Sequence, residues 1–161
     1  MQQFLSLRML KNAILECVEA GARELRHFIN EDFMISNKEG INNLVTEVDH
    51  ASEKAIINVI KKHFPEHHIL SEEAGNLIQD SQYKWIIDPI DGTVNFAHRI
   101  PICCISIAVE YENKIVVAAI YNPFMKELYF GMGIETQHQP VLNVFVQFYH
   151  VGISMVQNVV L

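Results

Sequence analysis

Two aspartates three residues apart form the densest chemical signal in the chain. They lie in the run Asp88-Pro89-Ile90-Asp91-Gly92-Thr93, directly after the apolar stretch Trp85-Ile86-Ile87. Two carboxylates at the end of a buried strand are costly unless a cation compensates their charge. Hard oxygen ligands of this kind favour Mg²⁺ over zinc. The pattern therefore predicts a magnesium site, and the alternative is a turn with solvated acids.

The residues around the second aspartate predict a site for an anion beside that metal. Pro89 is expected to fix a turn between the two carboxylates, and Gly92 allows the backbone to approach a ligand closely. If Thr93 begins a helix, the free N–H groups of Gly92 and Thr93 form an anion site. A phosphate held beside a divalent metal suits attack by a metal-bound water, with paired metals stabilising the attacking and leaving oxygens.

Further carboxylates come from two other segments. Glu72-Glu73 ends the preceding predicted strand, so both strand ends are expected to bring carboxylates to the same rim. Asp49 lies at the start of a predicted helix, where its alternative role is that of a capping acid. His67-His68 is assigned a packing or surface role, because no third nitrogen ligand is in register with it.

Two amphipathic helices are predicted to position these groups. Residues 4–29 carry apolar side chains every three or four positions, which is typical of a helix with one buried face. Residues 47–63 repeat the pattern, with Thr46 as the N-cap and Pro65 as the stop.

Short strands are predicted after Pro65, where the helical periodicity ends. Glu112-Asn113 is interpreted as a hairpin turn between two of them, and Asn122-Pro123 as a further turn. The predicted strands cover residues 68–70, 85–87, 102–110, 114–121 and 127–130. Helices followed by a meander indicate an α+β fold, with helices packed on a largely antiparallel sheet.

Composition limits the classes of protein to which the chain can belong. Its 161 residues suit one domain, and a net charge of −7 argues against a nucleic-acid partner. The three cysteines include the adjacent pair Cys103-Cys104, so we expect no disulfide framework, core packing for this pair, and a cytoplasmic location. We also expect no signal peptide and no membrane partner.

The last 31 residues differ from the rest of the chain. From Gly131 to Leu161 they hold a single charged side chain, Glu135, whereas a soluble domain has about one charged residue in four. One interpretation is a buried or edge β segment, because Val, Ile, Phe and Tyr are frequent there. The other is that residues 131–161 form a divergent tail, distinct from a domain over residues 1–130.

The central motif closely resembles the signature of the inositol monophosphatase family. The resemblance rests on WIIDPIDGTVNFAHRIP at residues 85–101, with LVTEVD at 44–49 and SEE at 71–73 in the expected order. YNP at 121–123 and ELY at 127–129 also look like bacterial members. The resemblance extends over residues 1–130.

This resemblance implies a layered α/β sandwich of the sugar phosphatase type and a Mg²⁺-dependent, lithium-sensitive phosphomonoesterase, with inositol 1-phosphate as the expected substrate. It assigns Glu72, Asp88 and the Ile90 carbonyl to the first metal, and Asp88 and Asp91 to the second. Thr93 and Asp49 would activate water, with Glu72 assisting. It assigns the Gly92 and Thr93 N–H groups to phosphate binding. It also places Lys38 in a loop near the site, and the alternative for Lys38 is an ordinary solvated lysine.

The resemblance stops where the charge is lost. Family members continue with a Trp-Asp motif whose aspartate completes the second metal site, whereas the only tryptophan here is Trp85. We therefore hypothesise that the fold is truncated after its first sheet and that residues 131–161 are read out of frame, which translation of the other two DNA frames would test. We expect little or no turnover, a non-catalytic remnant or binding module being the alternative function. An exposed sheet face favours self-association, with a homodimer as the candidate assembly.

Overall fold

The structure is a computed structural model that describes residues 2–31, 35–37, 44–136 and 139–141. Its helices are α1 (Gln2–Phe28), α2 (Glu47–His63) and α3 (Thr93–Ala97). Its longer strands are β3 (His68–Ser71), β5 (Tyr83–Asp91), β6 (Cys104–Tyr111), β7 (Lys114–Asn122) and β8 (Glu127–Met132). The short strands are β1 (Ile35–Asn37), β2 (Leu44–Thr46), β4 (Gly75–Leu77), β9 (Ile134–Thr136) and β10 (Gln139–Val141).

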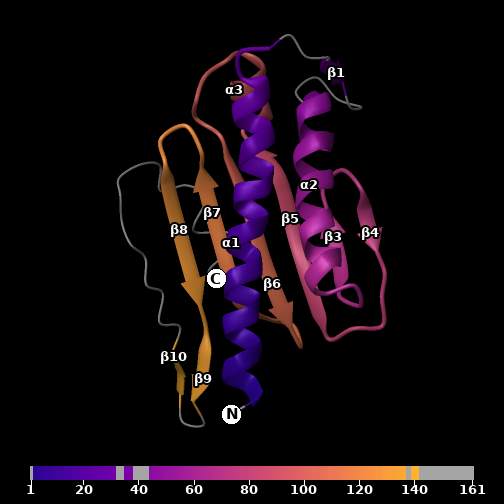
Figure 1. The fold of residues 1–161 in the computed structure, drawn as a ribbon, viewed down its shortest axis with the longest axis vertical. Helices are drawn as coiled ribbons and strands as arrows, with labels where there is room; N and C mark the ends of the chain where they lie inside the picture. The colour runs from indigo at the N-terminus through magenta and orange to yellow at the C-terminus, as the bar shows by residue number, and fades with distance from the viewer. Residues whose placement is uncertain (1, 32–34, 38–43, 137–138, 142–161) are drawn as a thin grey trace.

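Six strands form the main sheet in the order β4-β3-β5-β6-β7-β8 (Figure 1). β3 and β5 are parallel and every other neighbouring pair is antiparallel, which confirms the prediction of a largely antiparallel sheet. β6 and β7 meet at Glu112 and Asn113, whose φ angles are 49° and 64°. Positive φ at both central residues is the requirement of the two-residue hairpin turn that matches strand twist.

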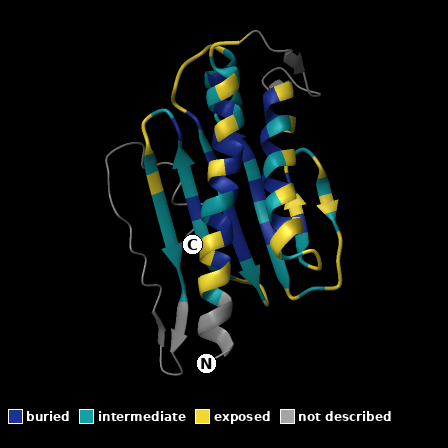
Figure 2. Ribbon diagram, viewed as in Figure 1, coloured by how far each residue is buried: buried dark blue, intermediate teal, exposed yellow. Residues whose placement is uncertain are grey.

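Both long helices cover the same face of this sheet (Figure 1). α1 packs on β6 and β7, and α2 packs on β5. The residues between the helices and the sheet are buried, and Figure 2 colours much of the central strands dark blue. On the sheet side this core includes Trp85 and Ile87, whose register partners Val109 and Ile107 are buried with them. The helices and the sheet thus form the α+β layers that the sequence predicts.

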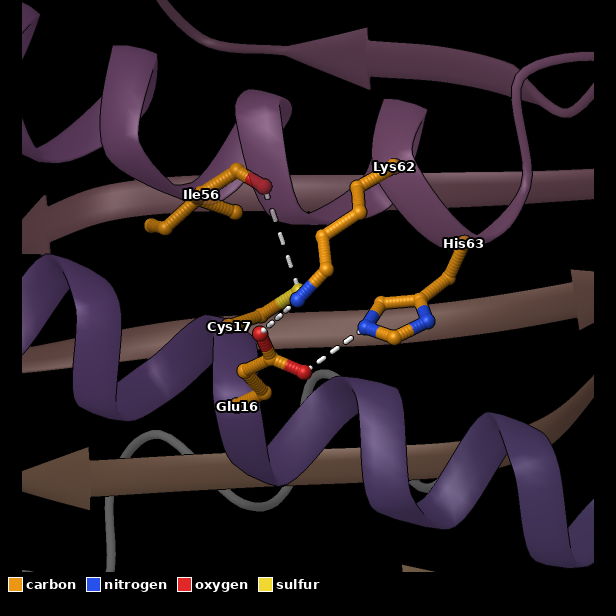
Figure 3. A network of polar contacts seen from close by, with 5 residues as sticks. All are labelled: Glu16, Cys17, Ile56, Lys62 and His63. Carbon is orange, nitrogen blue, oxygen red and sulfur yellow. Dashed lines mark hydrogen bonds and ion pairs between the residues drawn. The ribbon is translucent and has the colours of Figure 1, made fainter.

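Polar side chains connect α1 and α2 on their exposed side. Glu16 of α1 lies 3.0 Å from Lys62 Nζ and 2.7 Å from His63 Nε2 of α2 (Figure 3). Hydrogen bonds from Lys62 and then from His63 lower the pKa of the Glu16 carboxyl. Beneath this pair, the Cys17 thiol lies 3.9 Å from the Ile56 carbonyl.

The start of the charge-poor tail is a small hairpin in the described part of the chain. β9 and β10 pair antiparallel, with Glu135 opposite Pro140. This part agrees with the interpretation of the tail as a β segment, whereas residues 142–161 lie outside the described residues. None of the helices in the described ranges is long and apolar enough to cross a membrane.

Candidate metal and phosphate site

The two signature aspartates lie on β5 itself, which corrects the expected turn. β5 continues through Pro89 to Asp91, and its pairing with β6 moves from Asp88 opposite Ser106 to Asp91 opposite Cys104. The three residue steps from Asp88 to Asp91 on β5 therefore lie opposite the two steps from Ser106 to Cys104 on β6. The extra residue on β5 is a β-bulge. A bulge bends a strand and re-aims its side chains, so it performs here the function that we had assigned to a proline turn.

Glu72 joins these aspartates because β3 and β5 are parallel. Ser71 pairs with Ile87, and the Glu72 N–H donates to the Ile87 carbonyl at 3.2 Å. The two strands therefore end at the same edge of the sheet, which places Glu72 beside Asp88. The charge of Glu72 is one of those that act on Asp88.

The surroundings of Asp88 disfavour its negative charge. Burial, followed by the charges of Glu72 and Asp91, raises the pKa of Asp88 to about 7. Burial and then the charge of Glu72 also raise the pKa of Asp91. Among the described residues, no hydrogen-bond partner reaches the buried Asp88 Oδ1. A partnerless buried oxygen among repelling carboxylates is the electrostatic setting that a cation relieves.

The donor set fits Mg²⁺. All of the candidate ligand atoms are oxygens, which this ion prefers. Within the described ranges, no group of three or more His, Cys, Asp or Glu side chains is arranged to hold a metal ion by itself. Mg²⁺ does not require one, because it dehydrates reluctantly and keeps several waters beside one or two carboxylates.

Thr93 links this cluster to α2. Its hydroxyl lies 3.2 Å from Asp49 Oδ1 and 2.9 Å from the Ile90 carbonyl. The Asp49 side chain is only 2% exposed, so it faces inward rather than into solvent. Asp49 is near the α2 N-terminus, as a capping acid would be, but its contact with Thr93 gives it a second role between the helix and β5.

Gly92 turns the chain from β5 into α3. Its φ of 94° is a conformation that glycine adopts without strain, and a Cβ there would lie 3.0 Å from the Ile102 carbonyl. α3 begins at Thr93, which is the condition for an anion site here, and Phe96 N–H donates to the Gly92 carbonyl at 3.0 Å. The first N–H groups of a helix have no intrahelical acceptor, so those of Gly92 and Thr93 are candidate phosphate donors.

Two buried polar residues of α2 beside this site, Ser52 and Glu53, were not predicted from the sequence. Ser52 donates to the Pro89 carbonyl at 3.1 Å, and Glu53 accepts a hydrogen bond from Ser71. The detectable signal was helical spacing, since Asp49, Ser52 and Glu53 lie on the same face of α2 as the buried Ile56.

Other candidates have different positions. Lys38 lies outside the described residues. His67 stacks between the rings of Phe64 and Tyr83 and accepts a hydrogen bond from Trp85 Nε1, which fits the expected packing role. His68 hydrogen-bonds to Asn76.

The adjacent cysteines contribute to packing. Cys103 is buried and Cys104 half-buried, and neither forms a disulfide. Burial raises the pKa of both thiols to about 12, so they remain protonated near neutral pH. This agrees with the core role expected for Cys103, whereas Cys104 lies outside the buried core.

Comparison with known proteins gives one consistent family. Residues 7–143 match the model of the inositol monophosphatase family. A "Nus factor SuhB" from Haemophilus influenzae is 43% identical over 122 residues, which cover 75% of this chain and 46% of that protein. An inositol-1-monophosphatase from Synechocystis is 41% identical over 115 residues, covering 71% of this chain and 40% of its own.

Solved structures have the same fold. The extragenic suppressor protein suhB from Bartonella henselae superposes with a TM-score of 0.73 at 34% identity, covering 81% of this chain and 53% of the other. An IMPase/NADP phosphatase complexed with Mg²⁺ and phosphate gives a TM-score of 0.70 at 30% identity, covering 79% and 49%. The chain thus spans about half the length of the relatives that it matches.

Proposed function

Because the chain belongs to the inositol monophosphatase family, we propose that Glu72, Asp88 and Asp91 form a Mg²⁺-dependent phosphomonoesterase centre. The observation that carries the proposal is the buried Asp88 oxygen without a hydrogen-bond partner among carboxylates that repel it. The Ile90 carbonyl is the fourth proposed ligand. Asp88 belongs to both metal positions, Glu72 and Ile90 to the first, and Asp91 to the second.

The chain's own groups prepare the nucleophile and hold the substrate. The Thr93 hydroxyl donates toward Asp49 at 3.2 Å, so its oxygen lone pairs can accept a hydrogen bond from a water molecule. Proton movement from this water to Thr93 and on to Asp49 makes the pair a general base, and Glu72 assists. The Gly92 and Thr93 N–H groups orient the phosphate. Bound Mg²⁺ supplies a lowered water pKa and stabilises the attacking and leaving oxygens.

The proposed substrate is a small phosphate monoester, with inositol 1-phosphate as the first compound to test. Two relatives support this class by name, one as an inositol-1-monophosphatase and one as an IMPase/NADP phosphatase. We propose that Li⁺ inhibits the reaction and that the chain acts in the cytoplasm, where its three free thiols would stay reduced.

A non-catalytic binding role is the second candidate. It is favoured because the chain covers only 46% of a relative that is itself named a Nus factor and not a phosphatase. In that case the carboxylate site would bind Mg²⁺ without turnover.

Phosphate release from inositol 1-phosphate distinguishes the two candidates. We expect low but measurable release that requires Mg²⁺ and that Asp91→Asn reduces by more than about 10-fold, because a metal ligand is lost. Release that persists in Asp91→Asn or without Mg²⁺ would contradict the proposed centre. No release from a sample that is folded by circular dichroism would favour the binding role.

A further inference from the structure

The N-terminal half of α2 holds an unusual share of the buried polar side chains. In the part of the chain whose burial is described, the buried polar or charged residues are Asp49, Ser52, Glu53 and Ser71. The first three lie within five residues of α2. Asp49 contacts Thr93, Ser52 contacts Pro89, and Glu53 contacts the turn that carries Glu72.

Glu53 accepts several hydrogen bonds from that turn. Its Oε1 accepts from the Glu73 N–H at 3.1 Å, from the Ala74 N–H at 2.8 Å and from the Ser71 hydroxyl. The side chain is 6% exposed. A carboxylate this deeply buried is costly unless charge-assisted hydrogen bonds compensate it, and these three donors do so.

These contacts hold the chain on both sides of Glu72. The Glu72 N–H is bound to the Ile87 carbonyl of β5, whereas Ser71 and the N–H groups of Glu73 and Ala74 are bound to Glu53. The backbone of Glu72 is thereby fixed between β5 and α2. The charge of Glu72 adds to burial in raising the pKa of Asp88, so the two carboxyl groups are neighbours at this edge of the sheet.

We propose that Glu53 is a positioning residue for the metal centre, which acts by fixing the turn that presents Glu72 to Asp88. This inference rests on the proposed function, since it assigns Glu72 to the metal. Without the Glu53 carboxylate, two backbone N–H groups lose their acceptor and the turn reorganises toward water. Glu72 then leaves Asp88, and the affinity for Mg²⁺ falls although no ligand has been changed.

A purely structural role for Glu53 predicts a different outcome. Loss of the buried hydrogen bonds would lower the unfolding free energy, but folded molecules would bind Mg²⁺ as before. The decisive quantity is therefore the dissociation constant for Mg²⁺ measured on folded protein, compared among variants of similar stability.

The experiment measures Mg²⁺ binding by titration calorimetry in wild type, Glu53→Ala, Glu53→Gln and Ile60→Val. Ile60 is fully buried near the other end of α2, so its variant controls for lost stability. We expect Glu53→Ala to weaken Mg²⁺ binding by about 10-fold, the lower end of the range for residues behind metal ligands. Glu53→Gln keeps the acceptor oxygen and should stay within about threefold of wild type, as should Ile60→Val.

Hydrogen exchange provides a readout without metal. In Glu53→Ala the Glu73 and Ala74 amides should exchange faster than in Ile60→Val. If Glu53→Ala does not fold, Ser71→Ala removes a single donor from the same carboxylate and should weaken Mg²⁺ binding by about threefold.

Two failures can be told apart. Glu53→Ala that binds Mg²⁺ as tightly as Ile60→Val overturns this inference and leaves the proposed function standing. Wild type that binds no Mg²⁺ overturns the proposed function, and this inference with it.

Discussion

Asp88 is a carboxyl group whose surroundings favour the protonated form. Its pKa is about 7 in the folded chain and about 3.8 when the group is free in water. Between these two values the folded state holds a proton that the unfolded state has lost. The unfolding free energy therefore falls as pH rises from about 4 to 7, and above pH 7 no further stability is lost from this group.

Asp88→Asn should consequently stabilise the metal-free chain at pH 7.5, because it removes a charge that burial, Glu72 and Asp91 all oppose. We expect a gain of about 1–3 kcal/mol in the unfolding free energy, since each pKa unit corresponds to about 1.4 kcal/mol. Urea denaturation without Mg²⁺ checks this. The same variant should lose the stabilisation that added Mg²⁺ gives to wild type, and a variant less stable than wild type in both conditions would contradict the assignment.

At the scale of the elements, α1 and α2 approach each other closely at Gly21. A Cβ on Gly21 would lie 2.8 Å from Ser52 Oγ and 2.9 Å from the Cδ1 atoms of Ile56 and Ile105. Contacts this short require a neighbouring side chain to move. Ser52 cannot move freely, because it donates to Pro89 at the β5 bulge.

Gly21→Ala should therefore destabilise the fold by about 1–3 kcal/mol, as overpacking of a core does. The sign of the change in unfolding free energy is diagnostic, because Gly→Ala at an exposed helix position stabilises by up to about 1 kcal/mol. Thermal and urea unfolding measure it, with Glu19→Ala as a control at an exposed position of α1. Stabilisation by Gly21→Ala would show that the helices are not packed this tightly.

Periodicity and turn residues predicted the two long helices and the longer strands of this fold, but not the short strands β1, β2 and β4. The helix expected over residues 47–63 agrees with α2, and the hairpin at Glu112-Asn113 is confirmed. These features depend on local sequence. The β-bulge between Asp88 and Asp91 was misinterpreted as a turn, because proline is typical of turns and the pairing of β5 with β6 is not encoded nearby.

The candidate site was predicted where carboxylates stand out by type, at Glu72, Asp88 and Asp91. Ser52 and Glu53 were missed because, in sequence, they resemble ordinary solvated residues on a polar helix. Only the packing of α2 on β5 buries them and turns them toward Pro89 and the Glu72 turn.

At the scale of the whole molecule, two groups give opposite pH dependences. Burial lowers the pKa of His67 to about 4 from an ordinary value of 6.5, so the unfolded state holds the extra proton between these values. Stability from His67 therefore rises with pH from about 4 to 6.5, whereas stability from Asp88 falls over the same interval. In metal-free wild type the contributions of His67 and Asp88 to the pH dependence of the unfolding free energy therefore oppose each other.

Asp88→Asn should reveal the pH dependence that His67 contributes to the unfolding free energy. We expect its unfolding free energy to rise from pH 4.5 to 6.5 by about 1 kcal/mol, a figure reduced because His67 is partly open to solvent. Wild type should change less over that range. The double variant with His67→Asn, in which an amide oxygen can still accept from Trp85, should lose most of this rise. Urea unfolding at four pH values tests it, and an equal rise in the double variant would assign the slope to other groups.

The crowding of Asp49, Ser52 and Glu53 into five residues of α2 also constrains how this gene can change. An α-helix turns by about 100° for each residue, so one inserted or deleted codon upstream in the helix would rotate all three side chains together. Thr93, Pro89 and the Glu72 turn would lose their partners in a single event. The hairpin turn between β6 and β7 lies at Glu112 and Asn113. In the described part of the chain Glu112 hydrogen-bonds to Gln82 and not to the site, so length variation should be tolerated there and purged from the first two turns of α2.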